Sequence, residues 1–363
     1  MEAEAESGND RTWLIPVARA ADAVLLPLAA LLASLAIFAL FIAITGNSPL
    51  DVLAEMYRGA FGTWFSFQNT LLRAAPLMLT GLCTALPARL GLIVIGGEGA
   101  MVVGGVASAA AGLSVSDSPP MLVTTVMMLA GITVGGLWIA LAGALRVYRG
   151  VNETISSLLL AYLGIALLNH LVEGPLKDPE SLNKPSTRHI GEANMLGNLP
   201  GLDVHFGLLF GVVACVGCWL LMEKSVFGFA GRVVGGNPRA ARLSGLGVPR
   251  LVVITCFIAG GAAGLAGMVE VAAVHGKANA SLVTGYGYTG ILVAFLARHH
   301  ALSVIVVAVL LGGIAASGGL LQRTFELPDA TVNVLMGILF VVLLFSETFR
   351  GKFNVQRWLG GKA

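Results

Sequence analysis

The sequence predicts an all-α fold, a polytopic membrane bundle of about ten transmembrane or half-spanning helices. Hydrophobic residues make up 56% of the 363 residues, whereas charged residues make up only 12%, about half the share of a typical soluble domain. Apolar stretches recur along almost the whole chain, each close to the roughly 20 residues that a helix needs to cross a bilayer. The chain also holds 47 glycines, and small residues let membrane helices pack closely.

Ten apolar segments follow one another, separated by polar, charged or turn-forming residues. They are expected at residues 23–45, 70–88, 90–113, 120–145, 152–173, 205–223, 251–274, 288–297, 301–320 and 331–349. The segment 288–297 is short and predicts a half-spanning helix. The opening MEAEAESGND is acidic and lacks the basic region that begins a cleaved signal peptide. Residues 1–22 and 350–363 are therefore expected to form cytoplasmic tails on either side of a membrane domain at 23–349.

Basic residues predict the orientation of the chain in the membrane. With the amino terminus inside, most of the 22 lysines and arginines fall in cytoplasmic stretches, as the positive-inside rule requires. Both termini are then cytoplasmic. The proline-rich connection 174–204 lies outside and suits docking of a partner, whereas the basic connection 224–250 lies inside.

The cytoplasmic connection 224–250 predicts a short helix. Asn237 suits the N-cap, Pro238 suits the first helical position, and Gly245 suits the end. The helix is expected from Asn237 to Ser244, and its candidate functional residues are Asn237, Pro238, Arg239, Ala240, Ala241 and Arg242. Two interpretations stay open, because any long cytoplasmic loop can hold an interfacial helix. The other interpretation is a rigid peg that fits a groove on a separate motor protein.

Four phrases in this order resemble one family of membrane proteins. They are GLIVIGGEGAMVVGG from Gly91, VNETISSLLLAYL from Val151, GRVVGGNPRAARLSG from Gly231 and SLVTGYGYTGILVAFLARHHALSVIVVAVLLGG from Ser281. The chain resembles the permeases of ABC importers of the branched-chain amino-acid and simple-sugar type, in their nucleoside branch. The resemblance covers roughly Leu71 to Phe345, and the long outer loop is similar to that of the larger permease of heterodimeric members.

The resemblance implies a multi-pass subunit of the bacterial inner membrane, surrounded by lipid. In that family the subunit pairs with a second permease, two cytoplasmic ATPases and an external solute-binding protein. The expected function is inward transport of a small polar solute, namely a nucleoside, a nucleobase or related heterocycle, or a simple sugar. The short helix from Asn237 to Ser244 would then be the coupling helix that receives the motion of the ATPases.

Glu98 is a carboxylate inside an apolar segment, directly after the Gly96-Gly97 pair. Nine residues of helix place it about 13 Å from Arg89, where a charge costs roughly 2.5–3.5 kcal/mol on insertion scales. Such a residue needs a partner or a function. We consider two explanations: contact with the solute or a gate, or stabilisation of a half-helix N-terminus where the glycines break the helix.

The segment 152–173 holds two further pairs of polar candidates. Asn152 and Glu153 begin this helix, and they are expected either to cap it or to take part in an inner gate. Tyr162 and Asn169 are seven residues apart and share a face. They are expected either to line the solute pathway or to pack against neighbouring helices.

Residues 285–290 match G-x-G-x-x-G, but no strand precedes them, so a nucleotide site is not expected. A flexible entry to a half-helix is the better interpretation. Tyr286, Tyr288 and Thr289 would then offer ring faces and hydroxyls to the pathway, and core packing of the tyrosines is the alternative.

Several classes of function lack their sequence signals. No G-x-x-x-x-G-K-[ST] occurs to bind ATP, so the chain is not expected to be an enzyme and the energy must come from separate ATPase subunits. Net charge of +2 gives no reason to expect a nucleic-acid partner. Cys215 and Cys218 form C-x-x-C within an apolar segment and have no second pair, so neither a metal nor a cofactor is expected.

Two rival functions would leave different patterns in the sequence. An ion-coupled secondary transporter would use intramembrane acids or histidines, for which Glu98 is the candidate, and it would need no peg. A membrane-embedded enzyme would need a nucleophile, a base or metal ligands that converge in one cavity, and no such pattern is found in the sequence.

Four positions depart from the nucleoside-branch pattern by losing hydrogen-bonding groups. They are Val94, Ala100, Ala161 and Met336, where the resemblance implies polar residues. Because an unpaired buried hydroxyl costs about 1–3 kcal/mol, a site of this kind favours a flatter, less hydroxylated heterocycle over a sugar.

Overall fold

The computed structural model describes residues 14–348 except residue 182, and this part of the chain contains thirteen α-helices. Beside the helices, two isolated β-bridges occur in this part. The expected all-α fold is therefore confirmed. The expected tails at 1–22 and 350–363 lie mostly outside the described residues, but residues 14–22 belong to the first helix rather than to a tail. The chain divides into two compact units, which are described separately.

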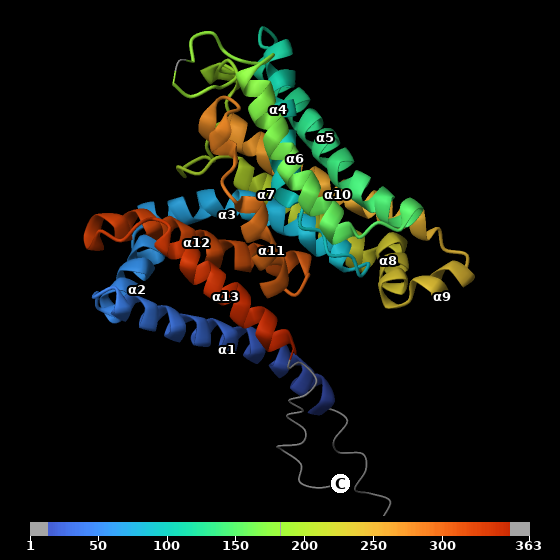
Figure 1. The fold of residues 1–363 in the computed structure, drawn as a ribbon, viewed down its shortest axis with the longest axis horizontal. Helices are drawn as coiled ribbons and strands as arrows, with labels where there is room; N and C mark the ends of the chain where they lie inside the picture. Colours follow the sequence, from blue (N-terminus) through green and yellow to red (C-terminus); the bar gives the residue numbers. More distant parts are fainter. Residues whose placement is uncertain (1–13, 182, 349–363) are drawn as a thin grey trace, which may run out of the picture. The chain divides into compact units, whose positions relative to one another are not determined.

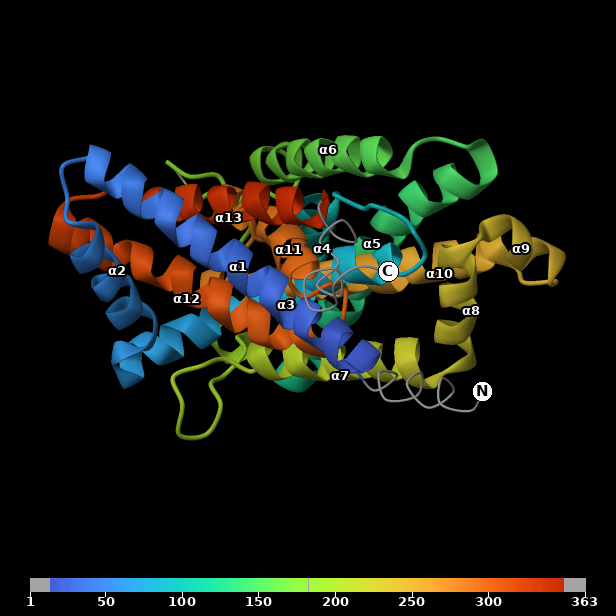
Figure 2. The ribbon, with the colours of Figure 1, turned by 90° about the horizontal axis from the view of Figure 1, so that it is seen from below.

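The first unit consists of the two ends of the chain. It contains α1 (Leu14–Ile44), α2 (Pro49–Tyr57), the end of α12 (Ala301–Phe325) and α13 (Thr331–Thr348). Helices α1 and α13 pack against each other, as Figure 2 shows. The buried side chains Phe38 and Ile42 of α1 contribute to the packing of this unit.

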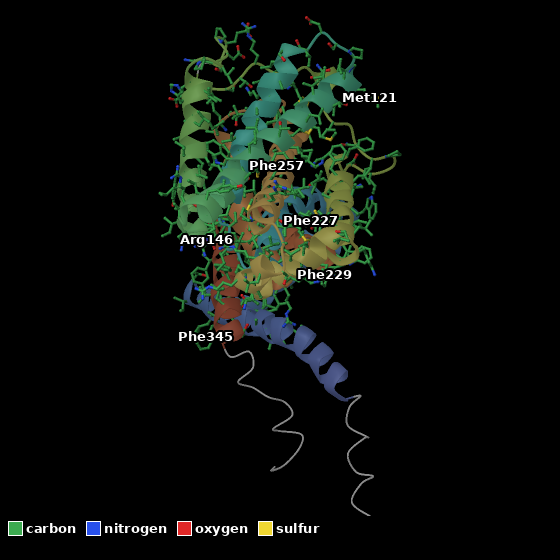
Figure 3. All side chains as sticks on the ribbon, turned by 90° about the vertical axis from the view of Figure 1, so that its right-hand side faces the viewer. Met121, Arg146, Phe227, Phe229, Phe257 and Phe345 are labelled. Atoms are coloured by element: carbon green, nitrogen blue, oxygen red, sulfur yellow. The ribbon has the colours of Figure 1, made fainter. Side chains whose placement is uncertain are left out.

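The second unit, Tyr57–Ser317, contains most of the helices. They are α3 (Trp64–Ala88), α4 (Gly97–Ser114), α5 (Pro120–Arg149), α6 (Glu153–Glu173), α7 (Gly207–Lys224), α8 (Val226–Gly236), α9 (Pro238–Leu243), α10 (Val248–Val269), α11 (Tyr286–Leu296) and the start of α12. Helix α10 packs against α3, α4 and α5. Figure 1 shows α4, α5 and α6 side by side, and Figure 3 labels Met121 and Arg146 near the two ends of α5.

Close backbone contact holds α4, α5 and α10 together. A Cβ atom on Gly264 would overlap the carbonyl group of Gly131, and a Cβ atom on Gly267 would overlap that of Met101. Only glycine allows the helices to approach so closely, which is the means by which membrane helices gain packing energy without a hydrophobic driving force. The many glycines of the sequence therefore serve the packing that their number predicted.

Six helices among the described residues are long and apolar enough to cross a membrane: α3, α5, α6, α7, α12, and α10 with its extension to His275. The extension Glu270–His275 is π-helical, and so is Arg58–Gly62 before α3. Helix α11 has 11 residues and confirms the half-spanning segment expected near 288–297. Helices α2 and α8 were not expected from the sequence.

The segment expected at 90–113 becomes helical only at Gly97. Residues 90–96 instead follow an irregular path, which begins at Gly91 with a φ of 77°. Neighbouring hydroxyls pair with this backbone: Thr84 Oγ1 donates to Val94 O (3.2 Å), and Ile95 N donates to Ser157 Oγ (3.1 Å). Non-helical backbone within a membrane domain requires such partners, and hydrophobicity alone did not reveal it.

The connection 174–204 folds back onto the π-helical extension of α10 and the residues that follow it. Backbone hydrogen bonds run from Thr187 N to Ala278 O (2.9 Å), from Ile190 N to Gly276 O (2.9 Å) and from Leu196 N to Ala272 O (2.8 Å). A short 3₁₀ turn, Glu192–Asn194, lies within the connection, and another, Ala280–Leu282, lies within the segment that it covers. The connection is thus held by backbone hydrogen bonds against the segment that follows α10.

Candidate functional site

Glu98 caps the N-terminus of α11. Gly285 N donates to Glu98 Oε1 (2.8 Å) and Gly287 N donates to Glu98 Oε2 (2.6 Å). The carboxyl side chain is fully buried. Two N–H groups at a helix start that have no partner within the helix thus meet a carboxylate, an arrangement that also complements the helix dipole.

Of the two explanations considered for Glu98, this geometry corresponds to helix capping. The capped helix differs from the expected one, because Glu98 lies in the first turn of α4 but binds the start of α11. Gly285 has a φ of 82°, and a Cβ on Gly287 would overlap the backbone of Glu98. Glycine at both positions therefore allows α11 to begin directly against α4.

The aromatic candidates lie beside this capped helix start. Tyr288 of α11 is 37% exposed and Tyr162 of α6 is 61% exposed, and the two hydroxyls are close enough to interact electrostatically. Asn169 is exposed on the same helix as Tyr162. Thr289 is partly buried, and Tyr286 is partly buried against the hydrophobic core. The structure thus brings Tyr162 and Tyr288 together, whereas Tyr286 lies against the core.

Two charged residues near this site were not among the sequence candidates. Glu270, which is 4% exposed, begins the π-helical extension of α10, and its Oε2 lies 3.8 Å from His275 Nε2. Arg73 of α3 is within electrostatic reach of Glu270 and Tyr286. The sequence signal for Glu270 is a carboxylate inside the apolar segment 251–274.

Asn152 is the N-cap of α6. Its Oδ1 accepts hydrogen bonds from Thr154 N (2.9 Å) and Ile155 N (3.1 Å). Glu153 is 8% exposed, and its Oε2 lies 3.2 Å from Arg146 Nε at the end of α5. The cap that was one of the two expectations for these residues is therefore present, together with an ion pair that joins α5 to α6.

The short helix expected in the cytoplasmic connection is present as α9. Asn237 Oδ1 accepts hydrogen bonds from Arg239 N (3.0 Å) and Ala240 N (3.1 Å), and Pro238 occupies the first turn. Arg239, Ala240 and Arg242 are exposed. Figure 2 shows α8 and α9 beyond the ends of α7 and α10.

Ala241 differs from the expectation that it is part of a docking surface. Its side chain is fully buried and belongs to the hydrophobic core of the second unit. Leu243 is instead 91% exposed on α9, and Phe229 of α8, labelled in Figure 3, is 60% exposed. Ala241 therefore anchors the short helix to the permease, and the exposed apolar surface comes from Leu243 and Phe229, which were not among the candidates.

An ion-pair cluster joins the base of this connection to the turn after α11. Arg89 at the end of α3 binds Glu223 Oε1 (2.6 Å) and donates from Nε to His299 O (3.0 Å). Arg232 of α8 lies 3.4 Å from Glu223 Oε2. A Cβ on Gly235 of α8 would overlap the carbonyl group of Arg89. Displacement of α8 would thus act directly on the residues that support the ends of α3 and α11.

Three of the four positions at which a polar residue was expected lie in the packed interior. Val94, Ala100 and Ala161 are fully buried, so their side chains contact the protein interior and not a solute. Ala161 packs against Gly99, where a Cβ would overlap the Ala161 backbone. Small apolar residues at these places are explained by helix packing.

The described residues contain no group of three or more His, Cys, Asp or Glu side chains placed to hold a metal ion. All four cysteines are buried and free. The side chains of Tyr162, Tyr288 and Asn169 can contact a small molecule through hydrogen bonds and aromatic rings.

Comparison with known proteins gives a consistent result over nearly the whole chain. The family model for the permease component of branched-chain amino acid transport systems matches residues 66–344. The glucose ABC transporter permease protein TsgB13 of Haloferax volcanii is 31% identical over 335 residues, which cover 89% of this chain and 88% of that protein.

Two guanosine ABC transporter permease proteins of Bacillus subtilis are also similar. NupP is 29% identical over 90% of this chain and 94% of its own length. NupQ is 25% identical over 79% of this chain and 92% of its own length. Relatives of this chain thus occur as paired permeases within one organism.

Proposed function

Since the chain belongs to the family of branched-chain amino acid transport permeases and is a transmembrane permease subunit of an ABC transporter, we propose that it imports a neutral nucleoside or related heterocycle. It is a multi-pass protein of the bacterial inner membrane, and permeases of this kind are not themselves catalytic. Membership of this family also decides against an ion-coupled secondary transporter.

The capped start of α11 is the observation that carries the proposal for a neutral solute. A free helix N-terminus inside a membrane domain attracts anions such as carboxylates and phosphates. Here Glu98 takes two N–H groups at the helix start, those of Gly285 and Gly287, and places a carboxyl group at this point. An anionic solute would therefore lose two binding partners and meet the carboxyl group, whereas a neutral solute avoids this conflict.

Aromatic side chains favour a planar ring. Tyr162 and Tyr288 both present exposed rings near the start of α11, and stacking of one heterocyclic base on an aromatic side chain is worth about 1–3 kcal/mol. Asn169 adds an amide that can form hydrogen bonds. The two guanosine permeases among the relatives support the same class of solute. The glucose permease supports a simple sugar as the second candidate.

The proposed coupling element is α9. Arg239 and Arg242 are three residues apart and exposed, so they can bind carboxylates or helix C-termini on an ATPase. Exposed Leu243 adds an apolar contact. Buried Ala241 fixes the helix to the permease, so that movement of an ATPase would be passed to α8 and the cluster around Arg89.

The proposed partners are a second permease, two ATPase subunits and an external solute-binding protein. The connection 174–204, whose residues Thr187, Ile190 and Leu196 are hydrogen-bonded to the segment after α10, would offer a surface on the outer side for the binding protein or the second permease. Membrane lipid would surround the remaining apolar faces.

Uptake by the complete transporter tests the proposal. Right-side-out proteoliposomes would be loaded with ATP on the inside, which is the cytoplasmic side, and uptake of tritiated guanosine would be measured with and without excess unlabelled glucose. We expect ATP-dependent inward transport of guanosine that glucose does not reduce. Transport of glucose without guanosine would establish the second candidate, and outward transport would contradict import.

A further inference from the structure

A half-open cavity of about 260 Å³ lies at the cytoplasmic end of α3 and α11. It is lined by Thr84, Ala88, Leu92, Ile93, Phe295 and His299, with Gly91 at its edge. Its volume is just below the range in which proteins hold drug-sized ligands, and a mostly apolar lining with few polar groups is typical of such sites. The cavity is therefore of a size for a single small ring system.

His299 supplies a polar atom without a partner. Its Nδ1 is buried and has no hydrogen-bond partner among the described residues. Burial and the nearby Arg89 guanidinium lower the pKa of His299, which favours the neutral imidazole. A buried polar atom that stays unpaired is costly and requires an explanation.

The backbone holds this histidine in place. Arg298 and His299 have φ values of 53° and 57°, and two successive non-glycine residues in this region are uncommon. His299 N donates to Ala294 O (2.8 Å), and His299 O accepts from Arg89 Nε (3.0 Å). The Phe295 ring meets the imidazole edge-on, with centroids 5.0 Å apart and an interplanar angle of 71°. Strained residues that the surroundings hold so firmly cluster at ligand sites.

The cavity also lies in line with the proposed solute pathway. Tyr288 and Phe295 are seven residues apart on α11, share one face, and are separated by about 10 Å along the helix axis. Thr154 Oγ1 of α6 donates to Ile93 O (2.9 Å), which connects the edge of the cavity to the helix that carries Tyr162. A solute that leaves the tyrosines toward the cytoplasm therefore meets Phe295 and His299 next.

We propose that this cavity is a second solute site, an exit site that binds the planar ring of a neutral nitrogen heterocycle before its release into the cytoplasm. The ring edge pairs with the His299 imidazole, which lines the cavity, and its faces contact Phe295 and the aliphatic side chains Leu92 and Ile93. A sugar, whose hydroxyls point in all directions, would leave most of them unpaired against this lining. The inference rests on the proposed function, which supplies the pathway in which the cavity lies.

Equilibrium binding of tritiated hypoxanthine to the complete transporter in nanodiscs, without ATP and without the solute-binding protein, tests the inference. We expect saturable binding by the wild type and an affinity at least about tenfold weaker in His299→Ala, because a buried hydrogen bond is lost. Ala88→Leu fills the cavity from α3 and should abolish binding. His300→Ala changes the next residue, which does not line the cavity, and should bind as the wild type does.

The outcomes separate this inference from the proposed function. Absence of binding in the wild type, unchanged binding in Ala88→Leu, or equal competition by glucose would each overturn the exit site. Ala88→Leu decides the matter if His299→Ala does not assemble. A transporter that imports guanosine but does not bind hypoxanthine in this cavity would contradict only the exit site. His299-dependent binding without any guanosine uptake would contradict only the proposed function.

Discussion

The two ends of α11 differ in how their polar groups are satisfied. At the N-terminus, Glu98 accepts two backbone hydrogen bonds and is fully buried. At the C-terminus, His299 has a buried Nδ1 without a partner and a left-handed backbone conformation. The first end is closed by the protein itself, whereas the second leaves a buried polar atom unpaired. This difference suggests that a half-helix can be fixed firmly at one end while its other end serves a ligand.

The largest effect is expected from removal of the cap. Glu98→Ala leaves two buried N–H groups unpaired, at about 1–3 kcal/mol each, and should strongly lower stability in thermal unfolding of the detergent-purified protein. Glu98→Gln keeps one good acceptor, so its stability in thermal unfolding should fall by about half as much as that of Glu98→Ala. Glu270→Gln is the matched control, because it neutralises a buried carboxylate that lies 3.8 Å from His275 rather than against a helix start. An equal loss of thermal stability in Glu98→Gln and Glu270→Gln would show that the effect comes from burial of the carboxyl group and not from the helix cap.

The next largest effect separates the two faces of α9. Arg239→Glu with Arg242→Glu should abolish solute-stimulated ATP hydrolysis while the permease keeps its thermal stability, because both side chains are exposed. Ala241→Trp should instead destabilise the permease by about 1–3 kcal/mol, since it overpacks a fully buried position. ATPase assays beside thermal unfolding distinguish the two results. Normal coupling in the arginine double variant would refute the role of α9.

A smaller effect is expected at the cluster that supports the carboxyl-terminal end of α11. The side chains of Arg89 and Glu223 are 21% and 28% exposed and 2.6 Å apart. A double-mutant cycle with Arg89→Ala and Glu223→Ala should give a coupling energy of about 1 kcal/mol, because solvent screens the pair in part. A coupling energy of zero would mean that this cluster does not connect α3 to α7.

The smallest effect is a dependence of stability on pH. Because the pKa of His299 is lowered from 6.5 in the folded protein, the unfolded chain binds more protons at this residue between the folded pKa and 6.5. The stabilising contribution is therefore present above pH 6.5 and is lost as the pH falls through the folded pKa. Thermal unfolding should show that His299→Asn loses less stability between pH 7.5 and pH 5 than the wild type does. Identical losses of stability in the two proteins would contradict this.

Much of the fold could be predicted from hydrophobic segments, because a helix is nearly the only way to satisfy the backbone inside a membrane. The prediction failed where that rule has exceptions. Residues 90–96 are apolar but not helical, since hydroxyls of Thr84 and Ser157 replace helical hydrogen bonds. Those hydroxyls come from other parts of the sequence, so no local pattern could reveal them.

The candidate site was predictable where the partner is local. Asn152 and Asn237 cap helices that begin one residue later, and short-range patterns identified both. The partners of Glu98 lie 187 and 189 residues further along the chain, so the sequence identified the residue but not the helix that it caps. Burial of Ala241 likewise depends on tertiary packing, and it could not be read from a helix of six residues.

Thiol labelling along α11 tests most directly the claim that this half-helix lines the solute pathway. In a background with the four native cysteines replaced, single cysteines would be placed at Tyr288, at Phe295 and, as a control, at Leu292, which is 4% exposed. The account predicts that a water-soluble reagent labels positions 288 and 295 in at least one nucleotide state and that guanosine slows the reaction, while position 292 stays unreactive. Unreactive cysteines at 288 and 295 in every state, or equal reactivity at 292, would contradict it.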